Sequence, residues 1–292
     1  MTTVSQWWEG SRPRTWPTAV SPVLAGTATA ISMGAARWWA AVLALVVALA
    51  LVVGVNFAND YSDGIRGADG ADRVGPLRLV GSGVAEPRVV RNAAFGCFAV
   101  AAVAGLVVSL ASGHWWLVVV GAACILAAWF YTGGSHPYGY AGLGEVFVFV
   151  FFGLVAVCGT TYVQADRVDA ATVWAAVAIG CLACGVLVAN NLRDIDGDRR
   201  VGKHTLATRL GHAGTRGLYV GLVGLVVLCV VVVAALTTWW CLLGLAMVVL
   251  LVAPVRAMLT RATGMALVPA LRNTGLAELA CAVGLFLGSL LA

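Results

Sequence analysis

Long apolar stretches, separated by short polar ones, run through almost the whole chain. A helix needs about 20 predominantly apolar residues to cross the hydrocarbon of a bilayer. The stretches are too long for strands and lack the alternation of a lipid-facing barrel strand. The pattern therefore predicts nine transmembrane helices, at approximately 15–34, 38–60, 91–111, 114–131, 143–163, 171–193, 214–236, 238–259 and 271–291.

Composition supports the same class of protein. Hydrophobic residues make up 61% of the 292 positions and charged residues 11%, which does not suit both the surface and the core of a soluble domain. We therefore predict an all-α polytopic membrane protein with one domain over residues 1–292. Its nine helices are expected to surround a central cavity that cytoplasmic loops cap.

The basic residues predict how the chain is oriented. Lys and Arg are retained on the cytoplasmic side of a membrane. If the N-terminus is cytoplasmic, every Lys and Arg lies in an inner segment except Arg37 and Arg167. We therefore expect a cell-membrane protein with its N-terminus in the cytoplasm and its C-terminus outside. The modest net charge of +5 then serves topology and anionic ligands, and no nucleic-acid partner is expected.

Two copies of one polar pattern interrupt the apolar stretches. Each reads N-x-x-x-D followed by a further Asp: the first acidic motif is Asn56, Asp60 and Asp63, and the second is Asn190, Asp194 and Asp198. Residues three or four apart share a helix face, so each motif lines one face at the predicted cytoplasmic end of a span. A single Asp at a membrane boundary is more often a solvated cap, but the duplication favours a functional site for a cation.

The chemistry of these side chains points to magnesium and a diphosphate. Mg²⁺ prefers one or two carboxylates, completed by water and substrate phosphate oxygens. Two such half-sites facing each other would hold a diphosphate between metal ions. Nearby basic side chains would neutralise the remaining phosphate charge: Arg66, Arg73, Arg78, Arg193 and Lys203. An allylic diphosphate would then leave readily, and aromatic faces would stabilise the resulting cation.

Four strings of residues resemble the UbiA superfamily of intramembrane aromatic prenyltransferases. They are NFANDYSDGIRG (56–67), DRVGPLRLVGSG (72–83), YTGGSHPYGYAGLGE (131–145) and NNLRDIDGDRRVGKHTL (190–206). The resemblance covers nearly the whole chain. Within the superfamily these strings are most similar to the branch that prenylates 1,4-dihydroxy-2-naphthoate in bacterial menaquinone synthesis.

The resemblance implies the reaction and several of its residues. A polyprenyl group would pass from polyprenyl diphosphate to 1,4-dihydroxy-2-naphthoate with decarboxylation, giving demethylmenaquinol. The implied catalytic and Mg²⁺-binding residues are Asp60, Asp63, Asp194 and Asp198. The diphosphate-binding candidates are Asn56, Asn190, Arg66, Arg193, Lys203 and Arg78, and the acceptor-binding candidates are Tyr131, Tyr138 and Glu145.

Some acidic residues fall outside this assignment. Many superfamily members carry a further Asp in the first motif where this chain has Gly67, and Asp69 follows two residues later. Asp196 lies on a different helical face from the other acids of the second motif. Glu278 is expected about one turn inside the last span. None of these acids receives a role from the sequence.

Alternative functions remain open from the residues alone. One alternative is a related prenyltransferase whose acceptor is 4-hydroxybenzoate or homogentisate. A CDP-alcohol phosphotransferase also uses acids at the membrane edge, but it concentrates them in one run. An ion-coupled transporter would place paired carboxylates near the midplane, in broken helices. The two separate motifs at the ends of spans favour the prenyltransferase.

Overall fold

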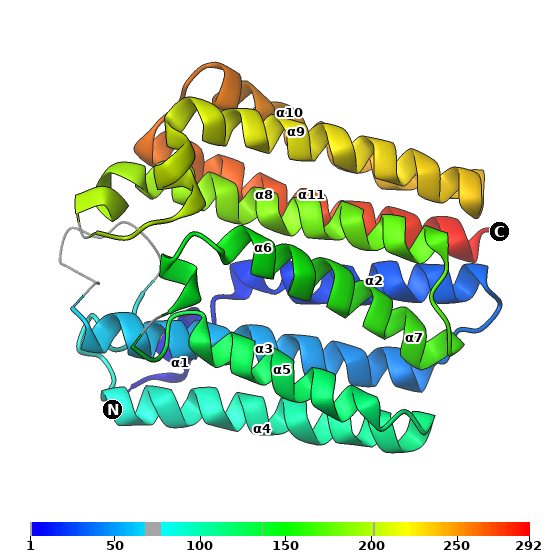
Figure 1. Cartoon of the computed structure of the whole chain (residues 1–292), viewed down its shortest axis with the longest axis horizontal. Coiled ribbons are helices and arrows are strands. Elements are labelled where there is room, and N and C mark those ends of the chain that lie inside the picture. Colours follow the sequence, from blue (N-terminus) through cyan, green and yellow to red (C-terminus); the bar gives the residue numbers. More distant parts are fainter. Residues whose placement is uncertain (1, 68–76, 136, 201) are drawn as a thin grey trace. The chain divides into compact units, whose positions relative to one another are not determined.

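The structure is a computed structural model that describes residues 2–67, 77–135, 137–200 and 202–292. All regular secondary structure within these ranges is helical (Figure 1). The all-α prediction is therefore confirmed for the described residues. Arg73, Asp69 and the loop residues around them lie outside these ranges.

The helices follow one another along the chain with short connections. The α-helices are α1 (Val4–Gly10), α2 (Pro17–Ser32), α3 (Trp38–Ile65), α4 (Pro87–Ser112), α5 (Trp116–Phe130), α6 (Gly144–Val148), α7 (Gly159–Ala165), α8 (Ala170–Arg200), α9 (Leu206–Leu236), α10 (Met247–Leu259) and α11 (Val268–Leu290). The other helical segments are η1 (Pro13–Thr15), η2 (Tyr138–Tyr140), the π-helix η3 (Phe149–Cys158), η4 (Trp239–Ala246) and η5 (Gly264–Leu267).

Seven helical stretches are long and apolar enough to cross a membrane, so the chain is a multi-pass membrane protein. They are Trp38–Ile65, Pro87–Ser112, Gly144–Ala165, Ala170–Arg200, Leu206–Leu236, Trp239–Leu259 and Gly264–Leu290. The other two predicted spans are helices of 16 residues (α2) and 15 residues (α5). Both are shorter than the roughly 20 residues that a straight span needs, so the described helices support seven of the nine predicted spans.

Both acidic motifs lie in the last turns of long helices. α3 continues to Ile65 and α8 to Arg200, several residues beyond the predicted ends of these spans. Each helix is followed by a glycine in the left-handed region, Gly67 at φ 66° and Gly202 at φ 70°. Glycine adopts this conformation without the steric penalty of a Cβ atom and commonly ends helices. The carboxylates are thus held on regular helix.

The first compact unit consists of Met1–Trp16 and Leu43–Gly139. Its core joins α3, α4 and α5 to the segment after residue 76, through Phe57, Leu79, Phe98 and Ala128. A Cβ atom at Gly54 would lie 2.6 Å from the Phe98 ring, so the glycine allows α3 and α4 to pack closely. This core holds the polar end of α3 against the segment that begins at residue 77.

The second compact unit consists of Pro17–Val42 and Tyr140–Ala292. Helix α8 is the most buried span of this unit. Of the residues in its apolar stretch 72% are buried, compared with at most 56% in the other spans. Small residues bring its elements together: a Cβ atom at Gly153 would lie 2.7 Å from the Cα of Gly180, and one at Gly284 would lie 2.4 Å from the nitrogen of Gly244. The second acidic motif therefore sits on the helix that the unit encloses most.

Candidate active site

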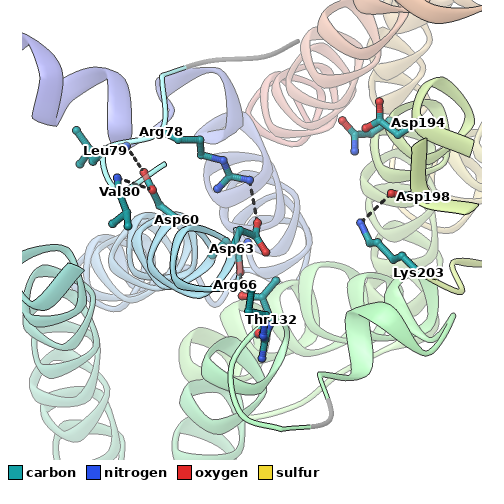
Figure 2. A network of polar contacts seen from close by, with 12 residues as sticks. Asp60, Asp63, Arg66, Arg78, Leu79, Val80, Thr132, Asp194, Asp198 and Lys203 are labelled. Atoms are coloured by element: carbon teal, nitrogen blue, oxygen red, sulfur yellow. Dashed lines mark hydrogen bonds and ion pairs between the residues drawn. The ribbon is translucent and has the colours of Figure 1, made fainter. Parts of the chain in front are cut away.

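Both carboxylate oxygens of Asp60 accept hydrogen bonds from the backbone of a neighbouring segment. The N–H of Leu79 donates to Oδ2 at 2.7 Å and the N–H of Val80 donates to Oδ1 at 3.1 Å (Figure 2). The residue is only 1% exposed. A buried carboxylate with two charge-assisted amide contacts is well satisfied, so Asp60 fixes the segment beside α3.

Asp63 and Arg78 form an ion pair within the same unit. The Arg78 Nη2 lies 3.0 Å from the Asp63 Oδ2, and the two side chains are 10% and 14% exposed (Figure 2). Asp63 lies one helical turn beyond Asp60 and is the more accessible acid of the first motif. The structure thus brings together a predicted metal ligand and a predicted diphosphate-binding residue.

Arg66 and Asn59 hold the segment that follows α5. The Arg66 guanidinium donates to the main-chain oxygens of Thr132 and Gly134. The Thr132 hydroxyl donates to the Asn59 Oδ1 at 2.6 Å. Sequence reasoning assigned Arg66 to the diphosphate and gave Asn59 no role. The available signal was the position of Asn59 beside Asp60, in the polar run at the end of α3.

Asn56 binds the N-terminal segment of its unit. Its Nδ2 donates to the main-chain oxygen of Ser11 and to the hydroxyl of Thr15, both at 2.9 Å. Asn56 is buried, and these contacts link α3 to Ser11, which follows α1, and to Thr15 at the end of η1. Its amide nitrogen therefore has a structural use that the N-x-x-x-D spacing does not reveal.

Two predicted acceptor-binding residues, Tyr131 and Tyr138, contact each other. Their ring centroids are 5.5 Å apart at an interplanar angle of 70°. The Tyr138 hydroxyl donates to the main-chain oxygen of Ala127 at 2.8 Å. Burial, and then the neighbouring Tyr131, raise the pKa of the Tyr138 phenol. Tyr138 is therefore a neutral hydrogen-bond donor at physiological pH, and it aligns the aromatic pair with the end of α5.

Two members of the second acidic motif, Asn190 and Asp194, bind Arg193 of the same helix. The Arg193 Nε and Nη2 donate to the two Asp194 carboxylate oxygens at 2.7 and 2.6 Å, and Nη2 also donates to the Asn190 Oδ1 at 2.9 Å. The Asp194 side chain is 38% exposed. The bidentate pair keeps a carboxylate, a guanidinium and an amide on one accessible face of α8.

Asp198 and Lys203 meet at the end of α8. The Lys203 Nζ lies 3.5 Å from the Asp198 Oδ1 (Figure 2) and 5.2 Å from the centroid of the Tyr140 ring. The Asp198 Oδ2 is buried and accepts no hydrogen bond from the described residues. Asp196 instead is 69% exposed and lies 3.6 Å from the His212 Nε2, which agrees with its expected place on another face.

Glu145 is buried in the second unit and is oriented by a residue that sequence reasoning missed. The Asn191 Nδ2 donates to the Glu145 Oε1 at 2.9 Å, and the Cys184 Sγ donates to the Glu145 main-chain oxygen at 3.1 Å. The Glu145 Oε2 accepts no hydrogen bond within the described ranges. This oxygen is an available acceptor next to the second motif, since Asn191 directly follows Asn190.

Glu278 lies deeper in its helix than the sequence predicts. Because α11 begins at Val268, Glu278 is about three turns from the start of the helix. The side chain is 0% exposed, and neither carboxylate oxygen has a hydrogen-bond partner among the residues that the structure describes. The prediction of one turn was wrong: even the predicted start at 271 leaves Glu278 about two turns inside the span, and α11 begins three residues earlier.

The carboxylates of the two motifs suit a metal ion whose coordination shell is completed by oxygen atoms of the substrate. In the described parts of the chain, no three or more His, Cys, Asp and Glu side chains gather into one metal-binding group. Mg²⁺ does not need such a cage, because water and phosphate oxygens supply most of its ligands. The buried Asp198 Oδ2 and the accessible Asp194 carboxylate are oxygen donors of the kind that Mg²⁺ takes.

The fold and these motifs define a membrane-embedded prenyltransferase, and comparison with known families agrees. Residues 19–271 match the UbiA prenyltransferase family, and the chain belongs to this family. The resemblance inferred from the four strings is thereby confirmed.

Relatives with assigned names cover almost the full length of the chain. The 1,4-dihydroxy-2-naphthoate octaprenyltransferase of Mycobacterium tuberculosis is 56% identical over 97% of this chain and 96% of its own length. The enzyme of the same name from Escherichia coli is 37% identical over 92% of this chain and 89% of its own length.

A solved structure shares the fold at low sequence identity. A UbiA homolog from Archaeoglobus fulgidus, bound to GPP and Mg²⁺, superposes with a TM-score of 0.68 at 13% identity, over 97% of this chain and 99% of the homolog. At this identity the similarity establishes the fold alone.

Proposed function

We propose that this protein transfers a polyprenyl group from polyprenyl diphosphate to 1,4-dihydroxy-2-naphthoate, with loss of carbon dioxide, to give demethylmenaquinol for menaquinone synthesis. The observation that carries the proposal is the 56% identity, over nearly the full length of both chains, to an enzyme named for this acceptor. Two acidic motifs with cationic neighbours at helix ends give the chain the groups that such a reaction needs.

Mg²⁺ is the proposed cofactor, held by carboxylates of both motifs. In the second motif the ligands are Asp194 and Asp198. In the first motif the proposed ligands are Asp60 and Asp63, of which Asp63 is the more exposed. Bound Mg²⁺ would neutralise charge on the leaving diphosphate. The Mg²⁺ and GPP bound to the archaeal homolog support this choice of cofactor and substrate class.

Basic side chains of this chain would bind and orient the diphosphate. Arg78, Arg193 and Lys203 each lie beside a motif carboxylate. Arginine offers a bidentate fork to phosphate oxygens and lysine a point charge. Arg66 would contribute indirectly, since its guanidinium holds the segment that carries Tyr131. That both motifs act on one diphosphate is supported by their shared spacing and their shared location at helix ends.

The reaction follows from these contacts. The bond between the allylic carbon and the diphosphate oxygen breaks, and its electron pair leaves with the diphosphate. The electron-rich naphthoate forms a carbon–carbon bond to the cation at its carboxyl-bearing carbon, and carbon dioxide leaves with restoration of aromaticity. The ring faces of Tyr131 and Tyr138 would stabilise the cation or orient the acceptor. The free Glu145 Oε2 suits a hydroxyl group of the acceptor.

The membrane topology completes the proposal. We infer nine spans in the cell membrane, with α2 and α5 as the two shorter crossings, the N-terminus cytoplasmic and the C-terminus outside. A single UbiA-type domain then extends over residues 1–292, and cytoplasmic loops cap its central cavity. The distribution of basic residues supports an active site on the cytoplasmic side.

One assay tests the proposed function. Membranes containing the protein are incubated with labelled polyprenyl diphosphate and 1,4-dihydroxy-2-naphthoate, with and without Mg²⁺, and lipid products are separated. We expect prenylated, decarboxylated product only when the acceptor and Mg²⁺ are both present. Parallel reactions with 4-hydroxybenzoate and homogentisate test the acceptor, and faster turnover with either would replace the naphthoate. No product from any acceptor would refute the prenyltransferase.

A further inference from the structure

Of the 18 Lys and Arg residues in the chain, Lys203 alone is a lysine. Its Nζ lies 3.5 Å from the Asp198 Oδ1 (Figure 2) and 5.2 Å from the centroid of the Tyr140 ring, and its side chain is 28% exposed. A cation within about 6 Å of an aromatic centroid is attracted to the ring face. The ammonium is thus held by a carboxylate and by an aromatic ring, and it remains partly exposed.

We infer that Tyr140 is a positioning residue, whose ring face holds the Lys203 ammonium in place for the substrate diphosphate. The inference rests on the proposed function, because it names what orients a diphosphate-binding lysine of that site. Tyr140 has no role in the assignments made from the motifs, so the inference adds a residue to the second half of the site.

Two loop segments bind each other and thereby fix the position of the ring. The His204 N–H donates to the main-chain oxygen of Tyr140 at 3.2 Å, and the Arg209 Nη2 donates to that of Ala141 at 2.9 Å. Gly142 has a φ of 78°, and a Cβ atom there would lie 3.0 Å from the His204 oxygen, so a glycine lets the segments approach. The chain around the ring is therefore bound to the chain that directly follows the lysine.

The backbone of Lys203 is fixed as well, but its ammonium is not fixed by the backbone alone. The Lys203 N–H donates to the main-chain oxygen of Asp198 at 2.9 Å. Two residues later the Thr205 hydroxyl accepts the Thr208 N–H and caps α9. A lysine side chain nevertheless has a flexible four-carbon stem. A contact at the ammonium itself is needed to orient it, and the Tyr140 ring supplies one.

Asp198 is less suited to this task than the ring. Its Oδ1 is 3.5 Å from the ammonium, which is longer than the 2.7–3.2 Å of ordinary N–H···O hydrogen bonds. Asp198 is also a proposed Mg²⁺ ligand, and a carboxylate bound to a divalent cation attracts an ammonium less strongly. A neutral ring does not compete for the metal. Tyr140 can therefore hold Lys203 whether or not Asp198 is occupied.

A double-mutant cycle tests the coupling of ring and ammonium. The variants are Tyr140→Leu, Lys203→Ala and the two combined, and Tyr162→Leu is a matched control, since Tyr162 is also half-buried but lies near the other end of the span Gly144–Ala165. For Tyr140→Leu we expect KM for the prenyl diphosphate to rise about 5- to 10-fold, with little change in kcat. Adding it to Lys203→Ala should have almost no further effect, since the effects of coupled residues are not additive. Tyr162→Leu should keep the wild-type KM.

Variants that keep the ring cover the case in which Tyr140→Leu folds poorly. Tyr140→Phe retains the aromatic face and should restore KM to within about twofold of the wild-type value. Replacing the same residue by pentafluorophenylalanine keeps a ring of similar size but removes the negative charge from its face. That replacement should raise KM for the prenyl diphosphate as Tyr140→Leu does.

The single lysine also allows a measurement without substrate or metal. Reductive methylation with a ¹³C reagent labels Lys203, and Lys203→Arg identifies its NMR signal against that of the N-terminal amine. Protons above an aromatic face are shifted upfield. We expect an upfield methyl signal in the wild-type protein, in Tyr140→Phe and in Tyr162→Leu, and loss of this shift in Tyr140→Leu.

The outcomes distinguish the inference from the function on which it rests. If the effects of Tyr140→Leu and Lys203→Ala multiply, or if Tyr140→Phe is as impaired as Tyr140→Leu, the ring does not act through the ammonium and the inference is wrong. The same Lys203 methyl shift with and without the ring would overturn it as well. If the wild-type protein shows no Mg²⁺-dependent prenyl transfer, the proposed function fails, whereas the NMR signal still reports whether Tyr140 holds Lys203.

Discussion

The two acidic motifs share one spacing but use it differently. In the first, Asn56 and Asp60 are buried and bind other segments of their unit. In the second, Asn190 and Asp194 both bind Arg193, a residue of the same helix. The first motif therefore holds the surrounding chain in place, while in the second motif Asn190 and Asp194 lie on a more accessible face and only Asp198 is buried. Equal spacing places residues on one helix face, but the neighbours of that face decide their roles.

Removal of the metal should have the largest effect, and it tests what the motifs have in common. A chelator is expected to abolish prenyl transfer, because the diphosphate would then leave without charge neutralisation. Added Mg²⁺ should restore the activity. The measurement is the rate of labelled product formation over a Mg²⁺ titration, and full activity in excess chelator would contradict a metal role for either motif.

Replacement of one accessible acid in each motif should be almost as severe. Asp63→Asn and Asp194→Asn remove a charge but keep the side-chain shape, so we expect kcat to fall on the order of 100- to 1,000-fold in protein that still folds and inserts. Purified variants would be assayed beside Asp196→Asn, which should retain wild-type turnover. Normal rates for Asp63→Asn would remove Asp63 from the proposed metal ligands.

A conservative change in the second motif should have an intermediate effect. Arg193→Lys keeps the positive charge but loses the bidentate contact with Asp194. We expect KM for the prenyl diphosphate to rise about tenfold, which corresponds to about 1.4 kcal/mol, and kcat to change little. Steady-state kinetics over a range of diphosphate concentrations measures the difference. An unchanged KM would show that Arg193 only contacts residues of its own helix and does not bind the diphosphate.

The smallest effect on activity is expected at Asn56, and it sharpens the contrast between the two asparagines. Asn56→Ala leaves the Ser11 main-chain oxygen without its donor, so stability should fall by about 1–3 kcal/mol. The Mg²⁺ requirement should not change. Asn190→Ala should instead weaken diphosphate binding with little loss of stability. Thermal unfolding in detergent and the KM for the prenyl diphosphate measure both, and equal behaviour of the two variants would remove the contrast.

Much of the fold and the identity of the motifs could be predicted from local sequence. Apolar stretches of sufficient length predicted the seven long spans, because hydrophobicity and helix length are properties of consecutive residues. The acidic motifs were correctly expected at the ends of spans, and the strings around them identified the family. The predicted ends of α3 and α8 were too early, because polar residues of the motifs continue each helix until Gly67 or Gly202.

The roles of individual polar atoms could not be predicted in this way, since their partners are distant along the chain. Asn59 meets Thr132 across 73 positions, Asn191 meets Glu145 across 46, and Asp60 meets Leu79 across 19. No periodicity links such positions. Asn59 and Asn191 were therefore missed, and Asp60 was predicted as a ligand without its two backbone contacts.

The sequence by itself determined an all-helical membrane protein of the UbiA family, with two carboxylate pairs on helix ends, because these properties depend on residues within a few turns of one another. Only the tertiary structure decided which oxygens of those pairs are occupied by backbone and which are available to a ligand. The physical reason is that a buried polar atom must find a hydrogen-bond partner, and packing alone determines which distant segment supplies it.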